Sequence, residues 1–363
     1  MSAGQLPRWV DLGLVPLVNL AAAFFFSGLV VLLIGENPIE AIKVLVWGAF
    51  GFGEGIGYTL FYATNFIFTG LAVAVAFHGG LFNIGGEGQA YIGGLGVAMA
   101  CLALDSIAPW WVTFPLAVLG AAFFGAAWAL IPAWLQATRG SHVVITTIMF
   151  NFIASSLMVY LLVENFTPAG SMQPASRAFL EGGQLPMMRS FFPYFGQSPL
   201  NFAIFLAIAA CLFVWLLIWR TRLGYEIRTF GANATAAEYA GISPVKITIV
   251  TMLISGALAG LMGINEVMGA QNRLMIDFTA GYGFVGIAVA LMGRGHPVGI
   301  VLAAVLFGML YQGGAELAFE IPAITRDMIV VIQGLVIMFA GALEHMFRPT
   351  LAAIFAPTKA MEA

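Results

Sequence analysis

Long apolar runs separated by short polar or glycine- and proline-rich stretches dominate the chain. A helix that crosses a bilayer needs about 20 mostly apolar residues, and about ten runs approach that length. The predicted spans are residues 13–34, 58–78, 88–104, 112–135, 143–163, 200–219, 246–267, 281–293, 297–314 and 328–346, of which 281–293 is shorter than a full crossing. The pattern predicts an all-α polytopic membrane protein, a single domain over residues 1–363 with its membrane core at 13–346.

Composition excludes a soluble fold. Hydrophobic residues make up 61% of the 363 positions and charged residues only 9%, whereas about 25% of a soluble domain is charged. Mean hydropathy is +0.97, as expected of a chain whose outer surface meets membrane lipid. The net charge of −3, with no basic or acidic tract, gives no indication of a nucleic-acid partner.

Lysine and arginine positions predict the orientation, because basic loops tend to stay cytoplasmic. With the N-terminus inside, nine basic residues fall inside and five outside. Both termini are therefore expected in the cytoplasm, with loop 164–199 extracytoplasmic and loop 220–245 cytoplasmic. The nine inside residues are Arg8, Arg139, Arg220, Arg222, Arg228, Lys246, Arg294, Arg348 and Lys359.

Two predicted outer segments have features beyond those of a simple connection. Asn37 and Pro38 offer an N-cap and a first-turn proline, so a short interfacial helix is expected after them. Loop 164–199 is rich in Gly, Pro, Ser and Gln and ends in aromatic residues. These aromatics suit either contact with a soluble partner or an aromatic belt at the membrane interface.

The predicted cytoplasmic loop 220–245 is the most polar internal stretch. Asn233 is a good N-cap, residues 234–240 are alanine-rich, Gly241 suits the C′ position, and Ser243 with Pro244 can start the next helix. A short helix lying across the membrane face is expected. Such a helix is too short to be stable alone, which favours one held by a docked protein over an ordinary solvated loop.

The stretch NIGGEGQ, residues 83–89, interrupts otherwise continuous apolar sequence. Lipid tolerates irregular backbone only where it is buried in protein or lines a wet cavity, so a broken helix is predicted. Asn83, Glu87 and Gln89 would then join exposed backbone groups as partners for a hydroxylated or heterocyclic solute. The alternative for Glu87 is that it caps a helix N-terminus and contacts no solute.

Other polar residues fall within the predicted spans or near their ends. Asn151, mid-span between two phenylalanines, is the best of these as a solute contact, and Asn65 is a further pathway candidate. The alternative is that such amides serve helix packing, at about 0.6 to 2 kcal/mol each. The remaining members of this group are Asn265, Glu266, Gln271 and Gln312.

Glycines indicate where helices approach closely or break. Gly256 and Gly260 in SGALAG form a small-xxx-small pair, which allows close helix contact. Glycines recur between Gly281 and Gly299, so the eighth and ninth spans are expected to include a broken or re-entrant segment.

Enzymatic functions find no support in the sequence. It contains neither a GxxxxGK[ST] phosphate loop nor an HExxH motif. The four histidines are scattered rather than grouped as metal ligands. No metal or other cofactor is therefore expected in this chain.

Three stretches resemble the permease family of bacterial ABC importers that serves branched-chain amino acids, simple sugars and nucleosides. They are residues 69–94, residues 228–242 with the following SGALAGLMG, and residues 281–300. The sequence is most similar to the nucleoside and simple-sugar branch of the family. This resemblance implies a type II ABC importer permease fold in a bacterial cytoplasmic (inner) membrane, most of all for a nucleoside, with branched-chain amino acids as the competing substrate.

The resemblance also implies partners. These are a second, paralogous permease chain, ATPase subunits that bind ATP and Mg²⁺, and an extracytoplasmic solute-binding protein. The long loop is similar to that of the larger of two paired permeases. A family helix that docks into the ATPase maps by position onto Asn233 to Gly241. The residues expected to couple to the ATPase are Arg228, Gly231, Asn233, Ala237, Glu238, Tyr239 and Gly241.

A secondary transporter or channel that works without ATP is the alternative from another class. It explains the hydrophobicity and the broken helices equally well, but not the polar cytoplasmic loop. An ion-coupled transporter also usually needs buried acids, and Glu87 is expected to be almost the only acid at membrane depth.

Overall fold

The computed structural model describes residues 7, 10–339 and 351, which are helical apart from connecting loops. Two isolated backbone bridges, Ala175 with Met275 and Met187 with Asn201, are the only extended pairings within the described part of the chain. The predicted all-α class is confirmed. The chain divides into two compact units, one formed by Met1–Gly51 with Met309–Ala363 and the other by Phe52–Gly308.

Eight helices in the described part of the chain are long and apolar enough to cross a membrane. The predicted runs 281–293 and 328–346 correspond to shorter apolar helices, so ten full crossings are not confirmed. Residues 340–346, Arg8, Arg348 and Lys359 lie outside the described residues. The eight long helices are Val15–Ile34, Gly53–His78, Gly86–Leu104, Trp110–Arg139, Val143–Phe166, Ala203–Arg220, Pro244–Gln271 and Pro297–Glu320.

The first unit contains α1 (Val15–Ile34), α2 (Pro38–Phe50), the later part of α12 (Pro297–Glu320) and α13 (Arg326–Ile337). A π-helical turn, Val10–Leu14, precedes α1. Helix α1 packs against α13. It ends at Gly35, whose φ of 93° requires the left-handed region that glycine adopts freely. The Asn37 side chain then accepts a hydrogen bond from Ile39 N at 2.9 Å, with Pro38 in the first turn. The predicted start of this helix is confirmed.

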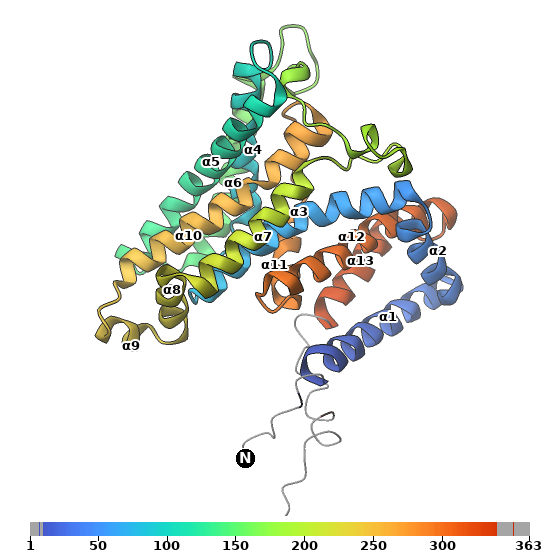
Figure 1. The fold of residues 1–363 in the computed structure, drawn as a ribbon. Helices are drawn as coiled ribbons and strands as arrows, with labels where there is room; N and C mark the ends of the chain where they lie inside the picture. Colours follow the sequence, from blue (N-terminus) through green and yellow to red (C-terminus); the bar gives the residue numbers. More distant parts are fainter. Residues whose placement is uncertain (1–6, 8–9, 340–350, 352–363) are drawn as a thin grey trace, which may run out of the picture. The chain divides into compact units, whose positions relative to one another are not determined.

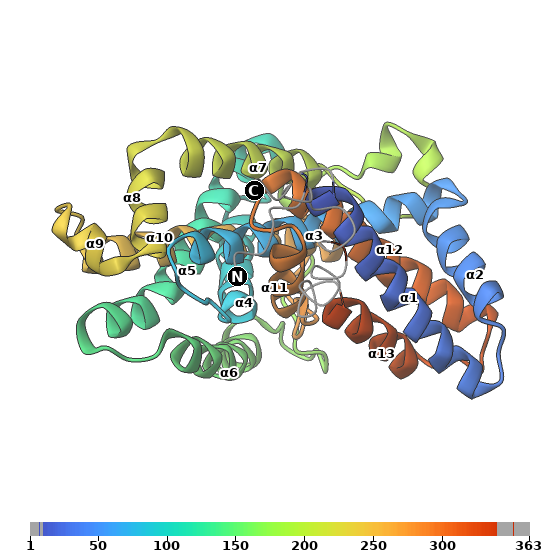
Figure 2. The same ribbon diagram turned by 90° about the horizontal axis from the view of Figure 1, so that it is seen from below.

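The second unit is built around α3 (Gly53–His78), most of which is buried. Helix α3 packs against both α10 (Pro244–Gly260) and α11 (Tyr282–Met292), as Figures 1 and 2 show. Helices α4 (Gly86–Leu104), α5 (Trp110–Arg139) and α10 form a second closely packed group. The remaining long helices are α6 (Val143–Leu161), extended by a π-helical turn at Leu162–Phe166, and α7 (Ala203–Arg220).

Close approach of α10 to α5 depends on the predicted glycine pair. A Cβ atom on Gly256 would lie 2.5 Å from the carbonyl oxygen of Gly125, and one on Gly260 would overlap the carbonyl of Ala121. Only a residue without a side chain lets the two backbones meet here. The predicted close helix contact is confirmed.

The broken segment was predicted within the eighth and ninth spans, 281–293 and 297–314, but α11 and α12 are each continuous there and the irregular backbone lies before them. A π-helix, η6 (Ile264–Gln271), continues α10. A non-helical stretch then runs beside α4 before α11 starts, with Asp277 N donating to the Tyr91 hydroxyl at 2.9 Å. Asn272, Asp277 and Ala280 adopt positive φ in this stretch. Leu274, Phe278 and Thr279 of this stretch are buried, whereas Asp277 and Ala280 are exposed.

Candidate functional site

The loop of residues 79–85 joins α3 to α4 inside the second unit and is held by a buried amide, Asn83. Its Nδ2 donates to Gln89 Oε1 and to Ser255 Oγ, both at 2.8 Å. Its Oδ1 accepts from Gly85 N at 2.9 Å. The Ser255 hydroxyl donates in turn to the Ala72 carbonyl of α3 at 2.6 Å. We call Asn83, Gln89 and Ser255 the Asn83 cluster; it joins α3, α4 and α10.

Asn151 reaches the same place from α6. Its Oδ1 accepts from Gly88 N at 2.9 Å, and its Nδ2 donates to the Ile84 carbonyl at 3.0 Å. Of the flanking aromatic residues, Phe152 is exposed and Phe150 packs on Trp128. The structure therefore brings together Asn83, Gln89 and Asn151, three of the predicted pathway residues, around the start of α4. Solute contact by these residues stays a prediction.

Glu87 lies in the first turn of α4 and faces the start of α11. Its Oε1 accepts from Gly281 N at 2.9 Å and its Oε2 from Gly283 N at 2.7 Å. Free N–H groups and the helix dipole make this end of α11 favourable for a carboxylate. A side chain at Gly283 would overlap the backbone nitrogen of Glu87, so the two helices meet directly. The capping role is confirmed, although the capped helix is not Glu87's own.

Asn65 belongs to a second buried cluster, which we call the Asn65 cluster. Asn65 Nδ2 donates to Glu266 Oε1 at 2.6 Å, and its Oδ1 accepts from Asn265 Nδ2 at 2.7 Å. The Asn265 side chain accepts in turn from Asn201 Nδ2 at 3.0 Å. All four residues are buried. Asn201 was not predicted from the sequence; it lies just before α7, and its partner Asn265 is 64 residues away.

Glu266 corrects one expectation from the sequence. Glu87 was expected to be almost the only acid at membrane depth, but Glu266 is 3% exposed. The reason is that η6 prolongs α10 to Gln271, so that Glu266 stays inside the bundle rather than at the end of a span.

The segment 220–245 contains two helices where one was predicted. The missed helix is α8 (Arg222–Ala232), whose N-cap Thr221 accepts from Gly224 N at 3.1 Å. Arg222 and Glu226 form an i,i+4 ion pair at 2.9 Å. Figure 1 shows α8 and the following α9 at one end of the second unit, with the loop of residues 164–199 at the other end.

Helix α9 (Ala234–Tyr239) has the predicted boundaries. Asn233 Oδ1 accepts from Ala236 N at 3.0 Å, and Gly241 follows the helix with φ of 80°. Gly241 N donates to the Glu238 carbonyl at 2.9 Å, and the next amide donates to the Ala237 carbonyl at 3.0 Å. This pair of bonds is a Schellman motif. The predicted cap and C′ glycine are confirmed.

The predicted coupling residues divide by exposure. Tyr239 is 91% exposed, and Arg228, Asn233, Glu238 and Gly241 are also exposed. Ala237 is fully buried and Gly231 is half-buried, so these two face the chain's own helices. Between α8 and the start of α10, an open groove of about 470 Å³ is lined by Arg222, Leu223, Glu226, Lys246 and Val250. This end of the unit therefore offers an aromatic tip and a charged groove to a partner.

At the opposite end, an ion pair fastens the long loop. Arg177 donates from two nitrogens to the Asp105 carboxylate, at 2.6 and 3.0 Å, and Leu180 N donates to the same carboxylate at 3.0 Å. The hydrogen bonds from Arg177 lower the pKa of Asp105 below its usual value. Phe179 N also donates to the Asn272 carbonyl at 2.7 Å. The loop therefore covers the ends of the helices rather than hanging free.

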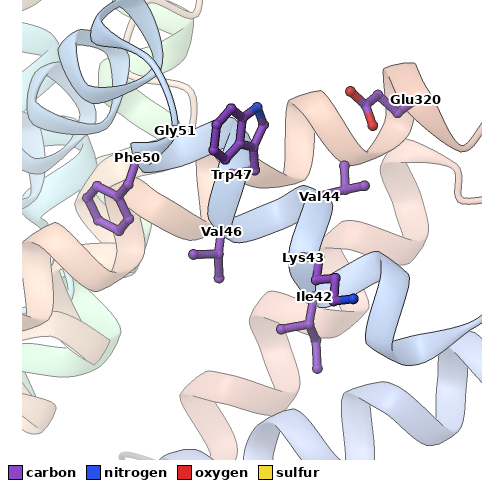
Figure 3. A pocket seen from close by; sticks show the side chains of 8 residues that line it. All are labelled: Ile42, Lys43, Val44, Val46, Trp47, Phe50, Gly51 and Glu320. Carbon is purple, nitrogen blue, oxygen red and sulfur yellow. The ribbon is translucent and has the colours of Figure 1, made fainter.

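An apolar groove of about 760 Å³ lies along α2 in the first unit. Ile42, Val46 and Phe50 project from one face of the helix (Figure 3), as residues four apart do. The exposed apolar side chains suit the predicted interfacial helix. The complete lining is Ile42, Lys43, Val44, Val46, Trp47, Phe50, Gly51 and Glu320.

Transport permeases of several organisms are similar in sequence to this chain. Residues 55–341 match the family described as branched-chain amino acid transport system, permease component. The guanosine ABC transporter permease protein NupP of Bacillus subtilis is 35% identical over 333 residues, 91% of this chain and 93% of the relative. The nucleoside ABC transporter permease protein NupB of Lactococcus lactis subsp. cremoris is 34% identical over 336 residues, 90% of each chain. The glucose ABC transporter permease protein TsgB13 of Haloferax volcanii is 34% identical over 340 residues, 92% of this chain and 88% of the relative.

A second relative, named for the same transport activity, is found in Bacillus subtilis and in Lactococcus lactis. These second relatives are 28% and 29% identical to this chain, over 69% and 73% of its length. Each of the two organisms thus has two different permeases of this kind.

Proposed function

Because this chain belongs to the branched-chain amino acid transport permease family of ABC importers, we propose that it forms the import pathway for a nucleoside. A simple sugar is the second candidate class. The chain is the membrane-spanning permease component and not itself an enzyme.

The nucleoside assignment is supported by similarity. Two of the three relatives described above are named for guanosine or nucleoside transport and one for glucose.

ATP hydrolysis is assigned to a separate ATPase, which binds ATP and Mg²⁺ and docks on α8 and α9. The observation that carries this assignment is the exposed tip of α9. A six-residue helix with a side-chain cap at Asn233, a Schellman end at Gly241 and a 91% exposed Tyr239 is well shaped for insertion into a partner. Exposed aromatic residues are typical anchors of protein interfaces.

Two further partners complete the proposed importer. A paralogous second permease is supported by the paired permeases of Bacillus subtilis and Lactococcus lactis. An extracytoplasmic binding protein would deliver the solute at the end that carries residues 164–199. The proposed location of the protein is the cytoplasmic membrane. Both termini are proposed to be cytoplasmic, which agrees with the lysine and arginine distribution.

Uptake by the reconstituted complex tests the proposal. The chain would be placed in liposomes with its partner permease, ATPase and binding protein, and supplied with radiolabelled guanosine, uridine, glucose, ribose or leucine. We expect ATP-dependent uptake of a nucleoside, and none when the ATPase carries a hydrolysis-deficient substitution. Uptake of leucine alone would contradict the substrate class. Uptake that persists with the inactive ATPase would contradict ATP-driven import.

A further inference from the structure

At Gly231, helix α8 meets the end of α3 backbone to backbone. A Cβ atom on Gly231 would overlap the carbonyl oxygen of His78 and lie 2.8 Å from Gly80 N. In the other direction, a Cβ atom on Gly80 would lie 3.2 Å from the Cα of Gly231. Gly80 also has φ of 68°, a conformation that suits glycine. No flexible side chain separates the two segments.

Other elements meet α3 at the same point. The His78 ring donates from Nε2 to the Gly295 carbonyl, in the turn between α11 and α12, at 3.1 Å. The same ring packs edge-on against Trp219 of α7, with the ring centroids 5.2 Å apart. Gly79 faces Thr251 of α10 closely enough that a Cβ atom would lie 3.0 Å from its methyl group. The end of α3 is thus a junction of α7, α8, α10 and the turn after α11.

The loop that leaves this junction is short and tightly held. Leu81 N donates to the Ala76 carbonyl at 3.0 Å, and its side chain is buried in an apolar cluster with Met252. Asn83, three residues after Gly80, is fixed by the hydrogen bonds of the Asn83 cluster. Glu87 then holds the first turn of α11. Because each of these residues is held by hydrogen bonds, a displacement of Gly80 should move the start of α11 as well.

Helices α8 and α9 have one surface that is exposed and another that faces the helix bundle. Tyr239 is exposed for a partner, whereas Gly231 faces His78 and Gly80. Movement of a docked partner therefore reaches the bundle directly at Gly231. Close-packed backbone contacts transmit displacement because they cannot be compressed.

We propose that the contact of Gly231 with His78 and Gly80 is the point at which movement of α8 and α9 enters the membrane bundle. The loop of residues 79–85 then passes the movement to the start of α11 through Glu87. This inference rests on the proposed docking of an ATPase on α9, and assigns Gly231 and His78 as positioning residues for transport.

The test compares uptake per ATP hydrolysed in Gly231→Ala and Gly334→Ala complexes. The first substitution forces α8 away from α3. The second adds the same methyl group in α13, where it would meet nothing within 4 Å, so it serves as the matched control. For Gly231→Ala we expect the ATPase to co-purify and to hydrolyse ATP, while uptake per ATP falls at least fivefold. The control should keep the wild-type ratio.

An unchanged uptake-to-ATP ratio in Gly231→Ala would overturn the inference. So would loss of ATPase co-purification in parallel with uptake, since Gly231 would then serve docking only. If Gly231→Ala does not elute as a folded complex, Gly80→Ala decides the matter. Its Cβ atom would lie 3.2 Å from the Gly231 Cα, so it disturbs the same contact from the side of the loop; it should also lower uptake per ATP, whereas a wild-type ratio refutes the inference. A wild-type complex without ATP-driven uptake would instead refute the proposed function.

Discussion

Replacing Ala237 with proline should uncouple ATP hydrolysis from transport by destroying α9. In the structure Ala237 N donates to the Asn233 carbonyl at 3.0 Å, and the Ala237 side chain is fully buried. Proline removes this donor, and its ring collides with the same carbonyl, which is four residues earlier. The substitution therefore attacks both the hydrogen bond and the packing of the helix.

The expected loss of helix stability is too large for so short a helix to remain folded. Proline in a helix interior costs about 3 kcal/mol relative to alanine, which lowers the population of the helix about a hundredfold. Helix α9 has six residues, and helices of that length owe their stability to packing rather than to their own hydrogen bonds. The membrane spans lie outside the altered segment and should form normally.

The assay measures ATPase co-purification and solute uptake for Ala237→Pro beside Ala234→Pro. Ala234 is the first residue of α9, where proline is tolerated because the helix needs no N–H there. Asn233, with φ of −159° and ψ of 104°, already has the extended backbone that a following proline favours. We expect Ala237→Pro to lose at least nine tenths of uptake and Ala234→Pro to retain most of it. Normal ATPase binding and uptake by Ala237→Pro would refute the coupling role of α9.

The loop of residues 164–199, the Glu87 cap and the orientation of the chain can each be tested. Arg177 lowers the pKa of Asp105, so the ionised pair stabilises the folded loop at pH values above the unfolded pKa of about 3.9. This contribution is lost as the pH falls through the folded pKa. Hydrogen exchange in residues 164–199, corrected for intrinsic rates, should therefore rise below about pH 4, and in Asp105→Asn it should already be raised at pH 7. Glu87→Gln should fold but transport more slowly and lose about 1 kcal/mol of stability, since an amide leaves one N–H of α11 poorly capped; unchanged uptake and melting temperature would show that the charge is dispensable. Reporters fused after Gly183 and Asn233 should label as extracytoplasmic and cytoplasmic respectively, and reversed labelling would contradict the proposed orientation.

Local signals made the helix ends predictable. The starts at Asn37, Asn233 and Ser243 and the end at Gly241 each depend on one side chain or one backbone angle within a few residues. Apolar run length located the long helices for the same reason. Where a rule needs only neighbours in sequence, the sequence is sufficient.

Helix α8 was missed because its own sequence argues against it. Gly224, Thr229 and Gly231 are poor helix formers in an eleven-residue segment. Packing overrides this preference. A side chain at Gly224 would overlap the Leu217 carbonyl of α7, and Ile227 is fully buried. The glycines that weaken the helix are the residues that let it lie against its neighbours.

The buried clusters could not be predicted because their partners are far apart in sequence. Asn65 and Asn265 are 200 residues apart, and Asn151 is 63 residues from the amide it binds at Gly88. A single sequence marks each as polar at depth without saying what it faces. The same limit hid Asn201, whose partner Asn265 is 64 residues away.

The buried amides already have hydrogen-bond partners within the chain, which affects where the importer can select its solute. Both Asn83 and Asn151 use their side-chain donors and acceptors on the chain's own groups. A solute that took those hydrogen bonds would leave the N–H of Gly85 or Gly88 buried without a partner, at about 1 to 3 kcal/mol each. That penalty would cancel most of what the new bonds contribute. The buried amides therefore favour a pathway that holds its solute weakly and releases it, with selection made by the extracytoplasmic binding protein proposed as its partner.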